Sequence, residues 1–186
     1  MNMKKIVATA SALSLTAAVA IGGTLAWLQD SSNTITNTFT WGEGNNINLT
    51  LAETTGTEYT IVPGKEDPKD PTLTLTTETE SYVYVVINNE LADYLDIVGM
   101  DTSAEGDWTK LTGDLPEGIT GDLYAYNTKM SGSETKIPVF TAVKYHNDLN
   151  QDNHSDLSGD IVITGFAVQA SAGTTAQEAW NATFGA

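Results

Sequence analysis

The 186-residue chain contains no cysteine and only two histidines. Without cysteine, disulfide frameworks, zinc thiolate sites, iron–sulfur clusters and cysteine nucleophiles are excluded. Such a chain must be held together by its hydrophobic core, by metal ions or by partner contacts. No glycine-rich phosphate-binding loop and no Gly-x-Ser-x-Gly motif occurs, so the usual sequence signals of nucleotide binding and serine hydrolysis are missing. We therefore predict that the protein is not an enzyme.

Positive charge is scarce, because eight lysines oppose 24 acids and arginine is absent. The net charge of -16 becomes -18 (6 minus 24) if residues 1–26 are removed, since two lysines and no acid lie there. A surface of this sign repels nucleic acids and anionic membranes. We therefore expect no nucleic-acid partner. The charge suits a soluble extracellular protein whose acids form a solvated, aggregation-resistant face.

The N-terminus has the organisation of a secretory signal peptide. Met1–Lys5 is basic, Ile6–Gly22 is apolar, and small residues stand at Thr24 and Ala26. This order predicts cleavage between Ala26 and Trp27. The alternative is a retained membrane helix, because Ile6–Leu28 is long enough to span ~30 Å of hydrocarbon. The stretch is only weakly hydrophobic and no basic stop-transfer cluster follows, which favours cleavage. Contact with the membrane is then limited to the signal peptide before the cut, and the product is secreted.

The rest of the chain is typical of an all-β protein. Alternating apolar and polar residues recur in short segments separated by Gly, Pro, Asn and Asp, which predicts an antiparallel β-sandwich. The segment "SYVYVVINNE" is almost continuously β-branched or aromatic and is expected to be a central strand. One or two short helices are predicted. The segment Leu91–Ile97 is expected to hold one or two turns, and in "TTAQEAWNATF" Thr174 or Thr175 and Glu178 have the spacing of a capping box.

Several motifs in order resemble the proteins exported with SipW-dependent signal peptides in Gram-positive bacteria, which include TasA fibre subunits and camelysin-like proteins. They are "IGGTLAWLQDSSNTITNTFTWG", "VPGKEDPKDPTLT", "LYAYN" and "ITGFAVQAS" followed by "AQEAW". The resemblance runs almost end to end. It implies a jelly-roll-like sandwich, processing by a dedicated signal peptidase, and a role in the biofilm matrix or at the cell surface.

The chain is thus expected to consist of a signal peptide (1–26), a mature N-terminal segment (27–41) and a sandwich domain (42–186). In fibre-forming members of the family, the freed N-terminal segment pairs with the sheet of the next subunit. Residues 27–41 have a β pattern, with Ile35, Phe39 and Trp41 on one face, so they fit the role of a donor strand. Head-to-tail donation builds a homopolymer that does not close. The alternative is that residues 30–41 form the first strand of their own sandwich, in a monomer.

One acidic loop has the spacing of a calcium site. Asp148, Asn150, Asp152 and Asp156 supply oxygens at loop positions 1, 3, 5 and 9, and Asp160 could replace the missing bidentate glutamate. The alternative is a solvated acidic loop between two strands. Calcium is the only cofactor that the sequence suggests.

Zinc proteolysis, described for camelysin relatives, has little support here. A protease helix needs His-Glu-x-x-His, whereas this chain has only His146 and His154 in a polar loop. Two hypotheses therefore remain: a fibre subunit that assembles by strand exchange, and a monomeric secreted module that binds a glycan or a protein. A metallopeptidase is a remote third.

Overall fold

A computed structural model describes residues 24–27, 47–55, 59–149 and 157–185 of the chain. These residues form antiparallel strands, one 3-10 segment and one α-helix. In chain order the elements are β1 (Thr24–Trp27), β2 (Ile47–Ala52), β3 (Glu66–Pro68), β4 (Thr72–Asn89), β5 (Leu95–Val98), β6 (Trp108–Lys110), β7 (Asp122–Tyr126), β8 (Met130–Pro138), β9 (Ala142–Tyr145), β10 (Ile161–Gln169), η1 (Ala170–Ala172) and α3 (Ala176–Phe184). The predicted all-β sandwich is confirmed.

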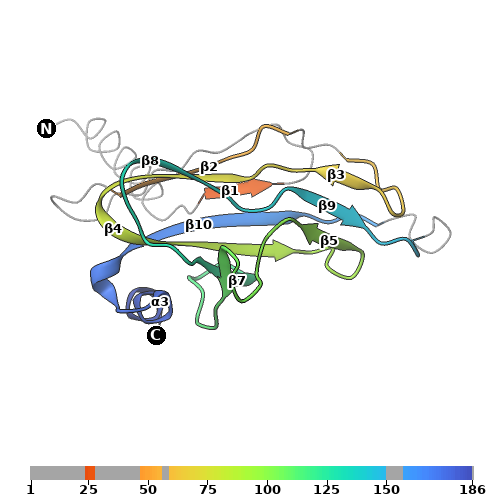
Figure 1. The fold of residues 1–186 in the computed structure, drawn as a ribbon. Helices are drawn as coiled ribbons and strands as arrows, with labels where there is room; N and C mark the ends of the chain where they lie inside the picture. Colours follow the sequence, from red (N-terminus) through yellow and green to blue (C-terminus); the bar gives the residue numbers. More distant parts are fainter. Residues whose placement is uncertain (1–23, 28–46, 56–58, 150–156, 186) are drawn as a thin grey trace, which may run out of the picture.

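The strand β4 has 18 residues and belongs to both layers of the sandwich (Figure 1). Its first part pairs with β2 on one side and β8 on the other. Its second part pairs with β10 and β7, and β6 lies beyond β7. A smaller sheet has the order β3–β9–β5, and short connections lead from β3 to β4 and from β8 to β9. A 2.9 Å hydrogen bond from the amide of Val139 to the carbonyl of Pro71 extends the pairing of β8 with β4 by one position.

Between its two parts β4 bends, and short-range hydrogen bonds stabilise the bend. The Thr77 hydroxyl accepts from the Thr79 amide at 3.1 Å and donates to the Thr79 carbonyl at 3.0 Å. The Ser81 hydroxyl donates to the same carbonyl at 3.0 Å. Thr77 and Ser81 are both buried, so these bonds satisfy polar groups that would otherwise be costly to remove from water. The pairing of β4 with β8 shifts register at this point.

The main core lies between the two layers. It is made of aliphatic and aromatic side chains from β2, from both parts of β4, and from β8, β9 and β10, among them Leu49, Leu51, Leu73, Leu75, Val83, Val85, Ile137, Phe140, Val143 and Ile163. The residues on β2 and β4 recur at every second position, as the alternation in the sequence predicts.

A second cluster covers the opposite face of β4, so that this strand is buried on both sides. The helix α3 places Trp180, fully buried, 5.0 Å from the ring of Tyr84 between ring centroids. The hydroxyls of Tyr82 and Tyr84 donate to the carbonyls of Thr174 and Ala176. This double burial explains why "SYVYVVINNE" is nearly all apolar. Tyr82, Tyr84, Trp108 and Trp180 are all buried.

The start of α3 confirms the predicted capping box. Thr175 is the N-cap, and its hydroxyl accepts from the amide of Glu178 at 3.2 Å. The Glu178 carboxylate in turn accepts from the amide of Thr174 at 3.0 Å. The first bond satisfies an amide that a helix leaves unpaired in its first turn, and the second bonds the residue just before the cap.

Of the one or two helical turns expected between Leu91 and Ile97, the structure has one. The chain makes one turn, in which the amide of Leu95 donates to the carbonyl of Leu91 at 2.8 Å, and then continues as β5. The side chain of Asn89 holds this turn, since it accepts from the amide of Leu91 and donates to the carbonyl of Leu95. Pairing of β5 with β9 outweighs the local helical pattern.

A buried ion pair fixes the connection between β2 and β4. The Nζ of Lys69 lies 2.9 Å from Oε1 of Glu53, and both side chains are almost fully buried. The same Nζ lies 3.9 Å from the ring centroid of Tyr59. Next to this pair, Oδ1 of Asp70 accepts from the amides of Thr54 and Thr55 at 2.8 and 2.9 Å. Because a broken buried pair leaves an uncompensated charge, this connection is held in one arrangement.

The hydrogen bonds to Asp70 predict a loss of stability in acid. Desolvation raises the pKa of Asp70, but the bonds from Thr54 and Thr55 outweigh it and lower the pKa to about 2. A carboxyl whose pKa is lower in the folded chain stabilises the fold above its unfolded pKa of roughly 4, and this contribution fades as the pH falls towards 2. We expect urea unfolding to show that D70N is less stable than the unmodified chain near pH 5, and that this difference shrinks by pH 2.

The variant D93N, which removes an exposed acid from the turn before β5, controls for the loss of one negative charge. A D70N difference that stays constant between pH 5 and pH 2 would contradict this role of Asp70.

Candidate functional site

The outer edge of β10 is the strongest candidate for a functional site. One side of β10 pairs with β4 over nine positions, from Ile161 opposite Asn89 to Gln169 opposite Ser81. The other side pairs with β1 over four positions, from Trp27 opposite Val162 to Thr24 opposite Gly165. Among the described residues, no strand pairs with the outer edge from Phe166 to Gln169. In the described part of the chain, this edge therefore pairs with an antiparallel strand over only part of its length.

Both faces of β10 are packed, so a strand added at its edge would extend an ordered sheet. Ile161 and Ile163 lie in the core between the layers, whereas Val168 lies under α3. Gly165 lies where β10 comes closest to the other layer. A Cβ at Gly165 would lie 2.5 Å from Cδ2 of Leu73 and 3.3 Å from Cδ2 of Leu49. Glycine is needed here for close approach.

The residues of the predicted cleavage site lie on β1. Thr24 is opposite Gly165, Ala26 is opposite Ile163 and Trp27 is opposite Val162. A cut between Ala26 and Trp27 would separate the first three residues of β1 from the domain and leave their pairing positions on β10 open. Cleavage itself stays a prediction. Ile35, Phe39 and Trp41, the residues predicted to act as donors, lie outside the described residues.

The predicted calcium loop is described only at its two ends. Asn150, Asp152 and Asp156 lie outside the described residues, and so does His154, whereas Asp148 and Asp160 lie within them. Burial and then the neighbouring Glu90 raise the pKa of Asp160. Its amide donates to Oε2 of Glu90 at 3.1 Å, and its buried Oδ1 has no hydrogen-bond partner in the described part of the chain. Calcium binding stays a prediction.

Metal and protease chemistry gain no new support from the described residues. Within them, no three His, Cys, Asp or Glu side chains gather as a metal site. His146 lies with Nε2 3.3 Å from Oδ1 of Asp96, which is an arrangement that an ordinary surface histidine also adopts.

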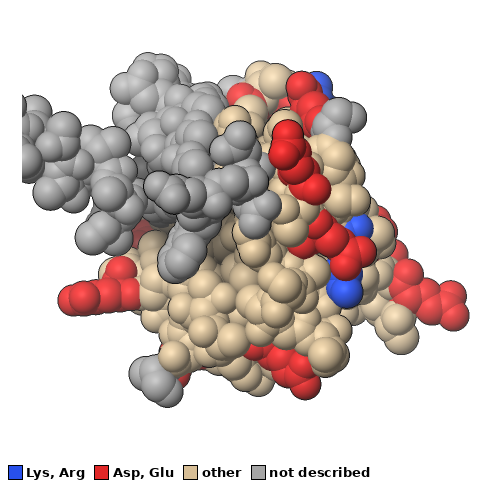
Figure 2. Space-filling model, turned by 90° about the vertical axis from the view of Figure 1, so that its left-hand side faces the viewer, with Lys and Arg blue, Asp and Glu red and all other residues tan. Residues whose placement is uncertain are grey.

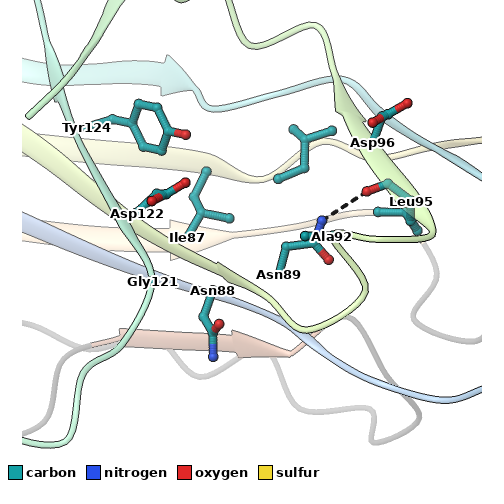
Figure 3. A pocket seen from close by; sticks show the side chains of 10 residues that line it. Ile87, Asn88, Asn89, Ala92, Leu95, Asp96, Gly121, Asp122 and Tyr124 are labelled. Atoms are coloured by element: carbon teal, nitrogen blue, oxygen red, sulfur yellow. Dashed lines mark hydrogen bonds between the residues drawn. The ribbon is translucent and has the colours of Figure 1, made fainter.

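A cavity that the sequence does not indicate lies on the other flank of β4. It has a volume of about 390 Å³ and is lined by residues from the end of β4, from β5 and its preceding turn, and from the start of β7 (Figure 3). Its lining residues come from two segments of the chain, 87–97 and 121–124. The pairing of β4 with β7 brings these two segments together.

The surface carries the expected acidic character. Figure 2 shows the end of the molecule where β4 bends, and on this face Asp and Glu clearly outnumber Lys. Most of the area between them is uncharged. Within the described residues, no helix has both the length and the apolar character needed to cross a bilayer.

Comparison with protein-family models, with characterised proteins and with solved structures finds no match for this chain.

The close approach at Gly165 predicts a specific coupling. We expect G165V to lower the free energy of unfolding by about 1–3 kcal/mol, because the new side chain collides with the buried Leu73. Removing the collision partner should relieve part of this cost. The loss in the double variant G165V/L73A should therefore be smaller than the sum of the two single losses. Denaturant unfolding of all four proteins measures this, and strictly additive losses would contradict the packing of β10 against Leu73.

Proposed function

We propose that this chain is an exported structural subunit of extracellular or cell-surface fibres. After cleavage of residues 1–26, the N-terminal segment of one copy adds as a strand to the sheet of the next copy. The observation that carries this proposal is the outer edge of β10, where, among the described residues, only the four residues of β1 pair, and these span the predicted cut.

The geometry of β10 suits the addition of a strand from another molecule. Backbone hydrogen bonds along β10 would supply the affinity, and alternate side chains of the donor would supply the register. The segment 27–41 has 15 residues, which can extend to roughly 50 Å. This exceeds the length of the nine-residue strand β10. The donor can therefore cover the whole edge and still reach back to its own domain.

The cut has a mechanical role in this proposal. Before cleavage, β1 lies on β10 and the segment that follows is tied to the signal peptide. Afterwards, residues Ile163 to Gly165 of β10 lose their partner strand. An open, long strand edge tends to pair with another chain. Each copy would donate one segment and accept another, so the assembly grows head to tail.

The negative charge of the subunit favours backbone strand pairing over electrostatic attraction between subunit surfaces. At a net charge of -18 after the cut, neighbouring copies repel one another. Pairing through the backbone does not depend on surface charge, and salt weakens the repulsion. We therefore expect salt to promote assembly. The resemblance to matrix-fibre subunits supports the same proposal.

The donor strand predicts a variant that folds but does not assemble. We expect F39D to abolish filament formation, because the carboxylate would have to enter the apolar side of the completed sheet. The matched control T38D places the same charge on the opposite face of the segment, which is polar in the sequence, and should still form filaments. Circular dichroism checks the fold and electron microscopy the assembly. Normal filaments from F39D would refute strand donation through this face.

A further inference from the structure

The cavity beside β5 has the composition of a small-ligand site. It lies on the flank of β4 that pairs with β7, opposite the flank that pairs with β10. Its volume of about 390 Å³ falls in the range of known ligand pockets. The cavity therefore lies on a different surface from the proposed assembly edge, so a ligand can bind there in a monomer and in a fibre alike.

The inner wall of the cavity is apolar and partly accessible. Ile87 and Leu95 are buried, whereas Ile97 and Tyr124 are only half-buried and pack against the core. Figure 3 shows Tyr124 and Asp122 on one side of the cavity and Asp96 on the other. An aromatic ring beside aliphatic side chains is a surface on which the C–H groups of a ligand can pack.

The rim carries hydrogen-bond acceptors on both sides. The side chains of Asp96 and Asp122 are 67% and 55% exposed, so their carboxylates can reach a ligand. The Nζ of Lys110 lies 2.7 Å from Oδ2 of Asp122 and 6.0 Å from the ring centroid of Tyr124. It offsets one of the two negative charges and leaves the rim acidic.

Asn89 has a structural role, because both its side-chain Nδ2 and its Oδ1 hydrogen-bond to the backbone around β5. It holds the far wall of the cavity in place. Gly121 on the β7 side passes so close to β4 that a Cβ there would lie 2.5 Å from the carbonyl of Ile87. Both walls are therefore fixed by the fold, and the cavity is preformed.

We propose that this cavity binds a single neutral hexose unit. The sugar presents a C–H face to Ile87, Ile97 and Tyr124, and its hydroxyls donate to the carboxylates of Asp96 and Asp122. Hydrogen bonds to ionised acceptors are stronger than those between neutral groups, and sugars offer several donors around one ring. The acidic rim on a chain of net charge -16 disfavours anionic sugars.

Titration of the purified full chain, followed by ligand-detected NMR, tests the proposal. The probes are glucose, galactose, mannose and N-acetylglucosamine, with glucuronate as the anionic comparison. We expect saturable binding of at least one neutral sugar, with glucuronate at least about tenfold weaker. D96N and D122N should each weaken binding about tenfold, because the charged acceptor is replaced by a neutral one. D93N, whose carboxylate lies outside the cavity lining, should bind as the unmodified chain does.

Both substituted carboxylates are more than half exposed, so the unfolding midpoints of D96N and D122N should match that of D93N. Three results would overturn the proposal: no saturable binding of any neutral sugar, equal binding of glucuronate, or sugar binding that D96N and D122N leave unchanged.

Discussion

The bend in β4 is the constraint on which the rest of the structure depends. Because this strand crosses from one layer to the other, the two sheets are fixed relative to each other by a continuous backbone. The bonds of Thr77 and Ser81 to Thr79 hold the bend. Beyond it, β4 is covered on both faces and paired on both edges. One flank carries β10, the proposed acceptor of a strand, and the other carries the cavity beside β7.

Local features of the fold follow from the sequence, whereas its pairings do not. Alternation predicts the core positions of β2 and β4, and continuous apolar character identifies Tyr82–Ile87 as a central strand. The spacing of Thr175 and Glu178 predicts the start of α3. At Leu91–Ile97 the helical pattern gives only one turn, because pairing with β9, a distant segment, overrides it. Strand neighbours depend on contacts between residues far apart in the chain, which periodicity does not encode.

The candidate sites follow the same rule: features that depend on short local patterns are visible in the sequence, whereas those that depend on strand pairing are not. The sequence indicates a donor segment and a cut, because both depend on short patterns. It cannot indicate the acceptor, because only the structure shows that, within the described residues, the outer edge of β10 has no neighbouring strand along part of its length. Gly165 is one of 16 glycines in the sequence, and only the structure shows that Leu73 lies against it. The cavity was missed for a similar reason, because its polar residues Asp96 and Asp122 come from separate strands.

The most direct test of strand donation is negative-stain electron microscopy of residues 27–186 beside the same chain begun at Thr40, each with and without calcium. Our account predicts filaments from the longer protein and none from the shorter, because only the longer protein has the complete donor segment. Calcium should at most strengthen filaments that the longer protein already forms. Monomers from both proteins under all conditions, or equal filaments from both, would contradict the account.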